Sequence, residues 1–162
     1  EDVKAYLWLF PQVDPQALSA IEHPRLPEDY FRLFHTAVER ADVYDDAVIC
    51  DLGRVYSPDL VAEVAERFLS MGEVRWSLAF GEWRGSLYFS LRTRDRRMNA
   101  GRLIREVIEE RGGSAGGHGA MAGARLSVRR LRPAARARLV RAIRQRFLRE
   151  FGVGRARARK LV

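Results

Sequence analysis

Consecutive glycines surround a histidine in the segment 112–123, which reads Gly-Gly-Ser-Ala-Gly-Gly-His-Gly-Ala-Met-Ala-Gly. Glycines permit positive φ angles and a close approach of the backbone, so several N–H groups can converge on one anion. An imidazole inside such a turn adds a further hydrogen-bond donor. We therefore predict an anion-binding turn around Gly116, Gly117 and His118, with a purely structural loop as the alternative.

A second candidate lies at the end of a strand-like run. Leu87, Phe89 and Leu91 alternate with less apolar residues, as in a strand that buries one face, and Arg92 follows them. A guanidinium presents parallel donors that match the oxygens of a phosphate. The position and type of Arg92 therefore indicate a residue that contacts a ligand.

Three segments would hold these residues in place. Residues 1–40 have helical spacing, with Asp14 as an N-cap before Pro15, and we expect a helical linker. Residues 41–130 alternate strand and helix patterns in the order β-α-β-β-α-turn-β, which predicts a small α/β domain with a mixed sheet. Residues 131–162 predict a basic amphipathic helix with a frayed tail.

The expected elements of the middle segment follow from apolar periodicity and turn residues. Strands are expected at 47–52, 74–80, 86–91 and 124–128, and helices at 60–69 and 99–110. A hairpin loop at 81–85 joins the second and third strands, so these two must be antiparallel. Trp76 alternates with apolar neighbours and is expected in the core.

The basic charge of the chain is concentrated at its C-terminal end. From Arg129 onward there are 13 Lys and Arg residues and one acid, Glu150, which leaves 16 basic and 20 acidic residues before them. No apolar run approaches the roughly 20 residues that a membrane helix needs. The lone Cys50 lies in an apolar run and is expected to be a buried, inert thiol, in keeping with a cytoplasmic location.

The order of these motifs carries a family resemblance. The strand Leu-Tyr-Phe-Ser-Leu-Arg-Thr at 87–93 precedes a helix, which leads into Gly-Gly-His-Gly-Ala-Met-Ala-Gly at 116–123. This arrangement resembles the DHH-associated C-terminal domain of the DHH phosphoesterases, in which a Ser-Leu-Arg-Ser-like strand is followed by Gly-Gly-Gly-His-x-x-Ala-Ala-Gly. The resemblance extends over about residues 42–128. The helical stretch before it is similar to the linker that joins this domain to the catalytic one.

The resemblance implies a set of substrate-binding residues: Ser90, Arg92, Thr93, Gly116, Gly117, His118, Ala122 and Gly123. His118 and the glycine backbone would hold a phosphate or ribose, Arg92 a terminal phosphate or base, and the two hydroxyls would add contacts. This sequence departs from the family pattern at Thr93, Ala115 and Met121. These departures leave short RNA, single-stranded DNA, adenosine bisphosphate, a cyclic-dinucleotide product and polyphosphate open as substrates.

The family's reaction uses two metal ions, held by aspartates and histidines that include an Asp-His-His run. This chain has no such run. His23 precedes a proline in the linker and His35 lies on an expected helix, so both are interpreted as ordinary surface or packing histidines. The resemblance therefore implies a substrate-binding fragment without catalytic or metal-binding residues of its own. Mn²⁺ or Mg²⁺ would lie in an N-terminal DHH domain, which is the expected partner besides the phosphorylated substrate, and no membrane contact is expected.

Two alternatives remain open. The chain is similar also to an accessory module of alanyl-tRNA synthetases, which implies nucleic-acid binding without hydrolysis, and the basic C-terminal helix would suit that role. For this C-terminal helix we favour docking on the domain through its apolar stripe. Contact with nucleic acid or with an acidic partner remains as an alternative. Trp8 is expected to pack on the DHH domain, and its exposure in a fragment would favour a homodimer.

Overall fold

The computed structural model describes residues 2–23, 25–95 and 97–162. The chain forms two units, one that extends to Phe31 and one that runs from Arg32 to Val162. The two units are described separately.

The first unit contains short helices with exposed apolar side chains. These elements are α1 (Asp2–Leu9), the 3₁₀ turn η1 (Phe10–Gln12) and α2 (Pro15–Glu22). The carboxylate of Asp14 accepts hydrogen bonds from the backbone N–H groups of Gln16 and Ala17, which confirms the predicted N-cap. Trp8 is 69% exposed, so these helices bury no core within their own unit.

The second unit alternates helices and strands after α3 (Glu28–Arg40), which crosses the boundary between the units. Its elements are β1 (Asp42–Tyr44), β2 (Ala47–Arg54), α4 (Asp59–Leu69), β3 (Trp76–Trp83), β4 (Ser86–Thr93), α5 (Ala100–Ile108), η2 (Glu109–Arg111), β5 (Ser114–His118), β6 (Met121–Ser127), α6 (Pro133–Glu150) and β7 (Arg159–Lys160).

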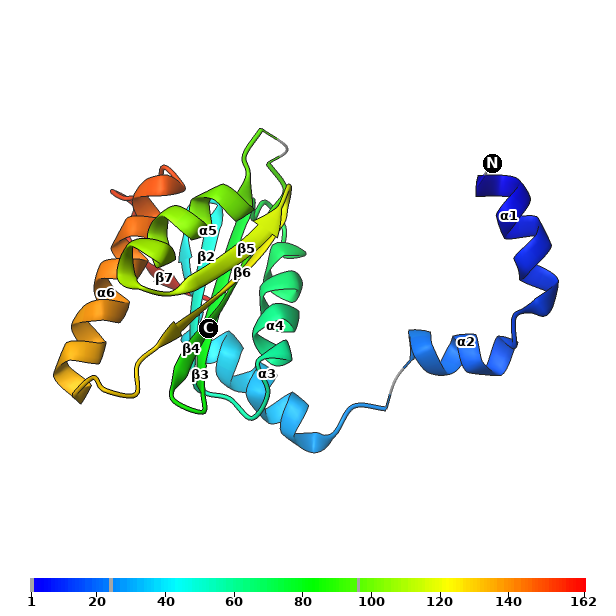
Figure 1. Cartoon of the computed structure of the whole chain (residues 1–162), viewed down its shortest axis with the longest axis horizontal. Coiled ribbons are helices and arrows are strands. Elements are labelled where there is room, and N and C mark those ends of the chain that lie inside the picture. The colour runs from blue at the N-terminus through cyan, green and yellow to red at the C-terminus, as the bar shows by residue number, and fades with distance from the viewer. Residues whose placement is uncertain (1, 24, 96) are drawn as a thin grey trace. The chain divides into compact units, whose positions relative to one another are not determined.

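All seven strands form one mixed sheet in the order β5-β6-β4-β3-β2-β1-β7. The pair β2–β3 is parallel and is connected through α4, whereas the other neighbours are antiparallel. Helices α5 and α6 cover one face of the sheet, and α4 covers the other (Figure 1). The predicted α/β class with a mixed sheet is confirmed.

The core lies on both faces of the sheet, because alternate residues of the central strands point to opposite sides. Leu78 of β3 packs under α5 and α6, while its neighbour Ala79 packs under α4. Trp76 is buried, as predicted, and its ring stacks on Phe151 with centroids 4.7 Å apart. Cys50 is also buried, and this burial raises the pKa of its thiol to about 12.

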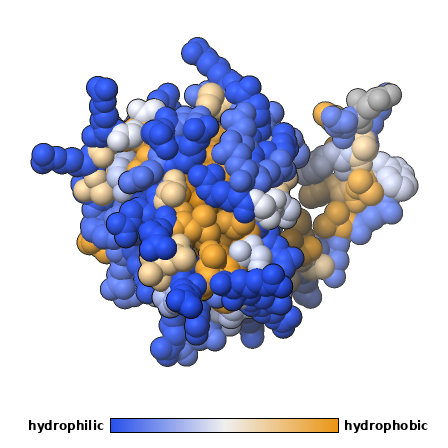
Figure 2. Space-filling view, turned by 60° about the vertical axis from the view of Figure 1, so that its left-hand side comes forward, coloured by the Kyte–Doolittle hydropathy of each residue, from blue (hydrophilic) through white to orange (hydrophobic). Residues whose placement is uncertain are grey.

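The C-terminal helix belongs to the same core. Ile143 and Phe147 of α6 are almost completely buried against the sheet, so the docked arrangement that we favoured is confirmed. The side of the molecule turned forward in Figure 2 is largely hydrophilic around one apolar area. Among the described residues, no helix is long and apolar enough to span a membrane.

Three parts of the sequence-based fold prediction are wrong. The strand β1 was not predicted. The expected glycine-rich turn is instead a hairpin in which β5 begins at Ser114 and β6 at Met121. The expected frayed tail contains β7, whose Lys160 pairs with Asp42 of β1. Glycine and arginine have low strand propensity, so these strands form because neighbouring backbone is available for pairing and not because of their own composition.

Candidate functional site

Three adjacent antiparallel strands, β5, β6 and β4, align side chains in rows across the sheet. The side chains that point toward the α4 face form three rows, namely His118–Met121–Arg92, Gly116–Gly123–Ser90 and Ser114–Arg125–Tyr88. Each outer row contains at least two large or charged side chains, and the middle row contains two glycines and a serine. This register creates a trough that crosses the strands.

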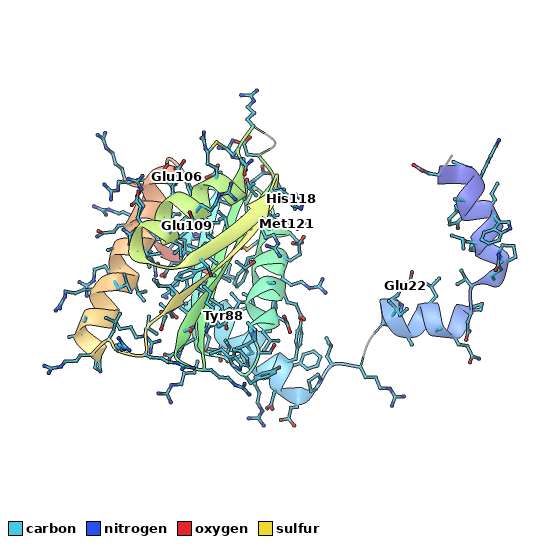
Figure 3. All side chains as sticks on the ribbon, viewed as in Figure 1. Glu22, Tyr88, Glu106, Glu109, His118 and Met121 are labelled. Carbon is cyan, nitrogen blue, oxygen red and sulfur yellow. The ribbon has the colours of Figure 1, made fainter. Side chains whose placement is uncertain are left out.

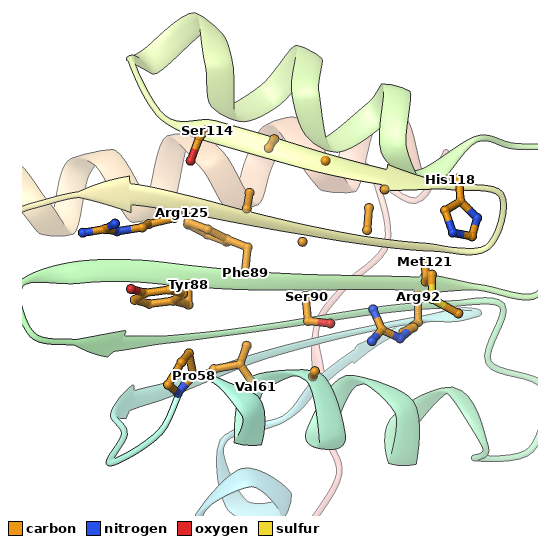
Figure 4. Close-up of a pocket in the computed structure, with 17 residues that line it drawn as sticks. Pro58, Val61, Tyr88, Phe89, Ser90, Arg92, Ser114, His118, Met121 and Arg125 are labelled. Carbon is orange, nitrogen blue, oxygen red and sulfur yellow. The ribbon is translucent and has the colours of Figure 1, made fainter.

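The trough is one side of a pocket of about 640 Å³, a size suited to a small ligand. The other side of the pocket comes from Pro58, Val61 and Ala62, at the start of α4. Figure 4 shows His118, Met121 and Arg92 at one end of the pocket, and Tyr88, Arg125 and Ser114 at the other.

The middle row has space and an unused hydrogen-bonding group. A Cβ added at Gly116 would meet no atom within 4 Å, so this position faces open space. Ser90 is only 4% exposed, and its hydroxyl has no hydrogen-bond partner among the described residues. Ser90 therefore contributes a small residue to the floor of the trough, and its hydroxyl oxygen is buried there.

Arg92 is held in position by two contacts. Its Nε donates to Oε2 of Glu66 on α4 at 2.9 Å, and its Nη1 donates to the carbonyl oxygen of Leu91 at 3.2 Å. The side chain of Arg92 is 16% exposed and that of Glu66 is 62% exposed. The carboxylate thus orients the guanidinium and offsets part of its charge, while the pocket still reaches the arginine.

The tip of the β5–β6 hairpin is fixed by its neighbours. The backbone N–H of Ala100, at the start of α5, donates to the carbonyl of Gly119 at 2.9 Å, and that of Thr93 donates to Ala120 at 2.9 Å. A Cβ at Gly101 would collide with the backbone of Gly117, so α5 lies directly against β5. These contacts place His118 at the end of the trough (Figure 3).

The structure brings most of the predicted site residues together. Those that line the pocket are Ser90, Arg92, Gly116, Gly117, His118, Ala122 and Gly123. Thr93 lies outside it, because alternation along β4 turns its side chain to the opposite face. Its hydroxyl donates to the carbonyl of Arg75 at 3.1 Å and accepts from the backbone N–H of Asp95 at 3.0 Å.

Sequence reasoning missed the other end of the pocket. Tyr88 shares the period-two alternation of Ser90 and Arg92 along β4, and this spacing was the signal that could have found it. Arg125 lies inside the strand predicted at 124–128, but the sequence did not show that this strand pairs with β4 and places Arg125 opposite Tyr88.

The described residues do not fit a two-metal site. Within residues 2–23, 25–95 and 97–162, no three His, Cys, Asp or Glu side chains lie close enough together to hold a metal ion. The exposed imidazole of His35 faces Glu39 one helical turn away, with Nδ1 and Oε2 3.7 Å apart. Asp42 is paired with Arg144 and Lys160.

The trough, the glycine-rich hairpin and the strand-end arginine lie together on one face of the mixed sheet. The family model described as the DHHA1 domain matches residues 45–148. The chain therefore belongs to the DHHA1 domain family, as the resemblance in its sequence implied.

Longer proteins contain regions that are similar to this chain in sequence or in fold. An uncharacterized protein of Methanocaldococcus jannaschii is 26% identical over 126 residues, which are 77% of this chain and 25% of that protein. The crystal structure of an exopolyphosphatase-related protein from Bacteroides fragilis is 18% identical, with a TM-score of 0.62 over 88% of this chain and 42% of that one. The DHH domain of a member of the s1p family of ribosomal proteins is 14% identical, with a TM-score of 0.50 over 75% of this chain and 30% of that one. This chain thus spans a quarter to less than half of these proteins.

Proposed function

We propose that this chain is the substrate-binding part of a metal-dependent DHH-family phosphoesterase that acts on short oligonucleotides, nucleotides or related phosphoesters. The observation that carries the proposal is the row His118–Met121–Arg92 at the end of a glycine-floored pocket. Two donor side chains from different strands there flank one site. Arginine and imidazole groups in such an arrangement suit a phosphate.

In this proposal the chain contributes binding and orientation to the reaction. The guanidinium of Arg92 neutralises phosphate charge, and Ser90 and the floor at Gly116 set how deeply the substrate sits. The Mn²⁺ or Mg²⁺ ions of such an enzyme would belong to an N-terminal DHH domain, since the donor set described above does not fit them. That domain would be the intramolecular partner, and the protein would act in the cytoplasm.

Titration of the chain with a 5′-phosphorylated dinucleotide, followed by NMR, tests the proposal. Arg92→Ala should weaken binding about tenfold, because a hydrogen-bonded charge is worth roughly 1.5–3 kcal/mol. The matched control is Arg94→Ala, which removes the same charge from an exposed side chain outside the pocket and should leave the affinity unchanged. Equal affinities of wild type, Arg92→Ala and Arg94→Ala would contradict the proposal.

A second candidate is a nucleic-acid-binding module without hydrolysis, which the arginines of α6 favour. Arg138 and Arg141 are exposed and have no acidic partner within the described part of the chain. Deleting α6 is no test, because Ile143 and Phe147 belong to the core. The double variant Arg138→Glu, Arg141→Glu keeps the fold, and a large loss of salt-dependent binding to single-stranded RNA would favour this candidate.

A further inference from the structure

The end of the trough opposite Arg92 has a different chemistry. Tyr88 lies four residues before Arg92 on β4 and faces the same side of the sheet. At about 3.3 Å per residue, the two positions are roughly 13 Å apart. Figure 3 shows Tyr88 well separated along the sheet from His118 and Met121. A phosphate held at the Arg92 end therefore leaves most of the trough free for the rest of the ligand.

The far end combines an aromatic ring with a cation. The guanidinium carbon of Arg125, which is the cross-strand neighbour of Tyr88, lies 5.8 Å from the centroid of the Tyr88 ring. The Nε of Arg125 donates to the hydroxyl of Ser86 at 3.3 Å, which keeps the side chain over the sheet. Trp83 packs edge-on against Tyr88, with centroids 5.8 Å apart. The ring and the guanidinium are therefore held by neighbours before any ligand arrives.

An apolar wall faces this pair. Pro58 and Val61 line the pocket across from Tyr88, so this end is a slot between apolar surfaces (Figure 4). A flat π system can stack on a tyrosine ring or on a guanidinium plane, whereas a chain of phosphates gains nothing from the apolar wall. The slot therefore suits a planar heteroaromatic group better than a second phosphate.

Between the two ends, the floor suits a sugar. The row Gly116–Gly123–Ser90 has no side chain larger than serine, and the buried Ser90 hydroxyl lacks a partner within the described structure. A ribose is compact enough to lie over a floor that has no large side chain. The order along the trough is then phosphate, sugar and base.

We infer that Tyr88 and Arg125 form a nucleobase-binding subsite, which makes the ligand of this pocket a nucleotide or short oligonucleotide and not polyphosphate. The inference rests on the proposed function and narrows it, because the phosphate-binding end alone accepts any phosphorylated compound. Tyr88 supplies the stacking surface and Arg125 the cationic edge.

The test compares two ligands, the dinucleotide 5′-pApA and inorganic tripolyphosphate, in NMR titrations of the chain. Wild type should bind the dinucleotide more tightly. Tyr88→Leu should weaken dinucleotide binding about tenfold, since stacking on an aromatic side chain is worth roughly 1–3 kcal/mol per base. The same change should leave tripolyphosphate binding as it is, and Tyr88→Phe should bind both ligands like wild type.

The possible outcomes separate the two hypotheses. Both the phosphate site and the base subsite are supported if Arg92→Ala weakens binding of both ligands and Tyr88→Leu weakens binding of the dinucleotide alone. If Tyr88→Leu affects the two ligands equally or not at all, or if wild type prefers tripolyphosphate, the base subsite is refuted and the phosphate site stands. If no ligand responds to Arg92→Ala, the proposed function fails as well. If the Tyr88→Leu variant does not fold, the Arg125→Gln variant replaces it in the comparison of the two ligands, because Arg125 is exposed.

Discussion

Arg92 carries a charge that the protein itself partly neutralises. Oε2 of Glu66, a residue of α4, lies 2.9 Å from the Nε of Arg92. The side chain of Glu66 is 62% exposed, so the pair is accessible to solvent. An arriving phosphate would compete with this carboxylate for the same guanidinium. Glu66 therefore acts as a positioning residue that fixes Arg92 at the expense of anion affinity.

Replacement of this carboxylate tests that balance. Glu66→Gln keeps a hydrogen-bond acceptor for Arg92 but removes the competing charge, and exposed ion pairs are worth about 0.2–1 kcal/mol. We expect phosphate-containing ligands to bind about threefold more tightly, with little change in unfolding free energy. Isothermal titration calorimetry measures the affinity, and an affinity below that of wild type would show that orientation of Arg92 matters more than its free charge.

At the scale of single residues, much of the site prediction came from residue types. The roles proposed for Arg92 and His118 follow from the chemistry of glycine, histidine and arginine, and these residue types can be read directly from the sequence. Tyr88 and Arg125 meet only through the β4–β6 register, and no local pattern encodes which residue lies opposite another. The hydroxyl of Thr93 resembled a ligand contact in the sequence, yet it is turned to the other face and bonds to backbone there.

At the scale of elements, the β5–β6 hairpin works because its glycines serve two separate purposes. Gly117 has a φ of +148°, and a Cβ there would collide with Met121 and Ala122, so this glycine permits the close pairing of β5 with β6. Gly116 has open space above it and faces the pocket. One glycine is therefore required by the fold and its neighbour by the ligand.

Two alanine substitutions at adjacent positions should separate these purposes. Gly117→Ala should lower the unfolding free energy by about 2 kcal/mol or more, because a Cβ there meets backbone atoms and the φ angle is unfavourable. Gly116→Ala should unfold like wild type and yet bind phosphorylated ligands more weakly. Urea denaturation and NMR titration measure the two effects, and equal stability of both variants would contradict the distinction.

The outer strands are joined to α6 by a charged cluster. Asp42 of β1 is paired with Arg144 of α6 and with Nζ of Lys160 in β7, the latter at 2.9 Å. Burial alone would raise the pKa of the Asp42 carboxyl, but the hydrogen bonds from Arg144 and Lys160 outweigh it and hold the pKa below its ordinary value.

A lowered carboxyl pKa makes stability depend on pH in a defined direction. As the pH falls, the Asp42 carboxylate takes up a proton near pH 4 in the unfolded chain and only at a lower pH in the folded one. The ionised Asp42 therefore makes its complete contribution to the unfolding free energy above about pH 4. It is lost as the pH falls through the folded value. Asp42→Asn should therefore unfold about 1 kcal/mol more easily at pH 7, and the difference from wild type should shrink as the pH falls through the folded pKa of Asp42. Parallel pH profiles from urea denaturation would contradict this assignment.

Apolar periodicity predicted the regular elements well where side chains are large. The strands that pack Leu78 and Leu91, and the helices above them, were placed from their spacing. The strands β1, β5 and β7 were missed. β1 has only three residues, and the glycines of β5 and the Arg-Lys pair of β7 give no period-two apolar signal, so only their partners in the sheet define them. The pocket depends on β5, so its shape could not follow from sequence alone.

On the scale of the whole molecule, the sheet separates two surfaces with different properties. The face covered by α4 contains the trough. The opposite face is covered by α6, which carries arginines and packs on the sheet through Ile143 and Phe147. The arginines of α6 are thus on the face opposite the pocket. In our proposal the trough holds the phosphorylated substrate for a separate catalytic domain, and the face with α6 is not required for that step.

The most direct test of this account maps where a phosphorylated ligand binds on the chain. Chemical-shift changes in the amides of the ¹⁵N-labelled protein would be recorded as 5′-pApA is added. We predict that the largest changes fall on β4, β5 and β6 around Gly116, His118 and Gly123. Changes confined to the arginine-rich surface of α6, with none in the trough, would contradict the claim that this pocket is the substrate-binding site.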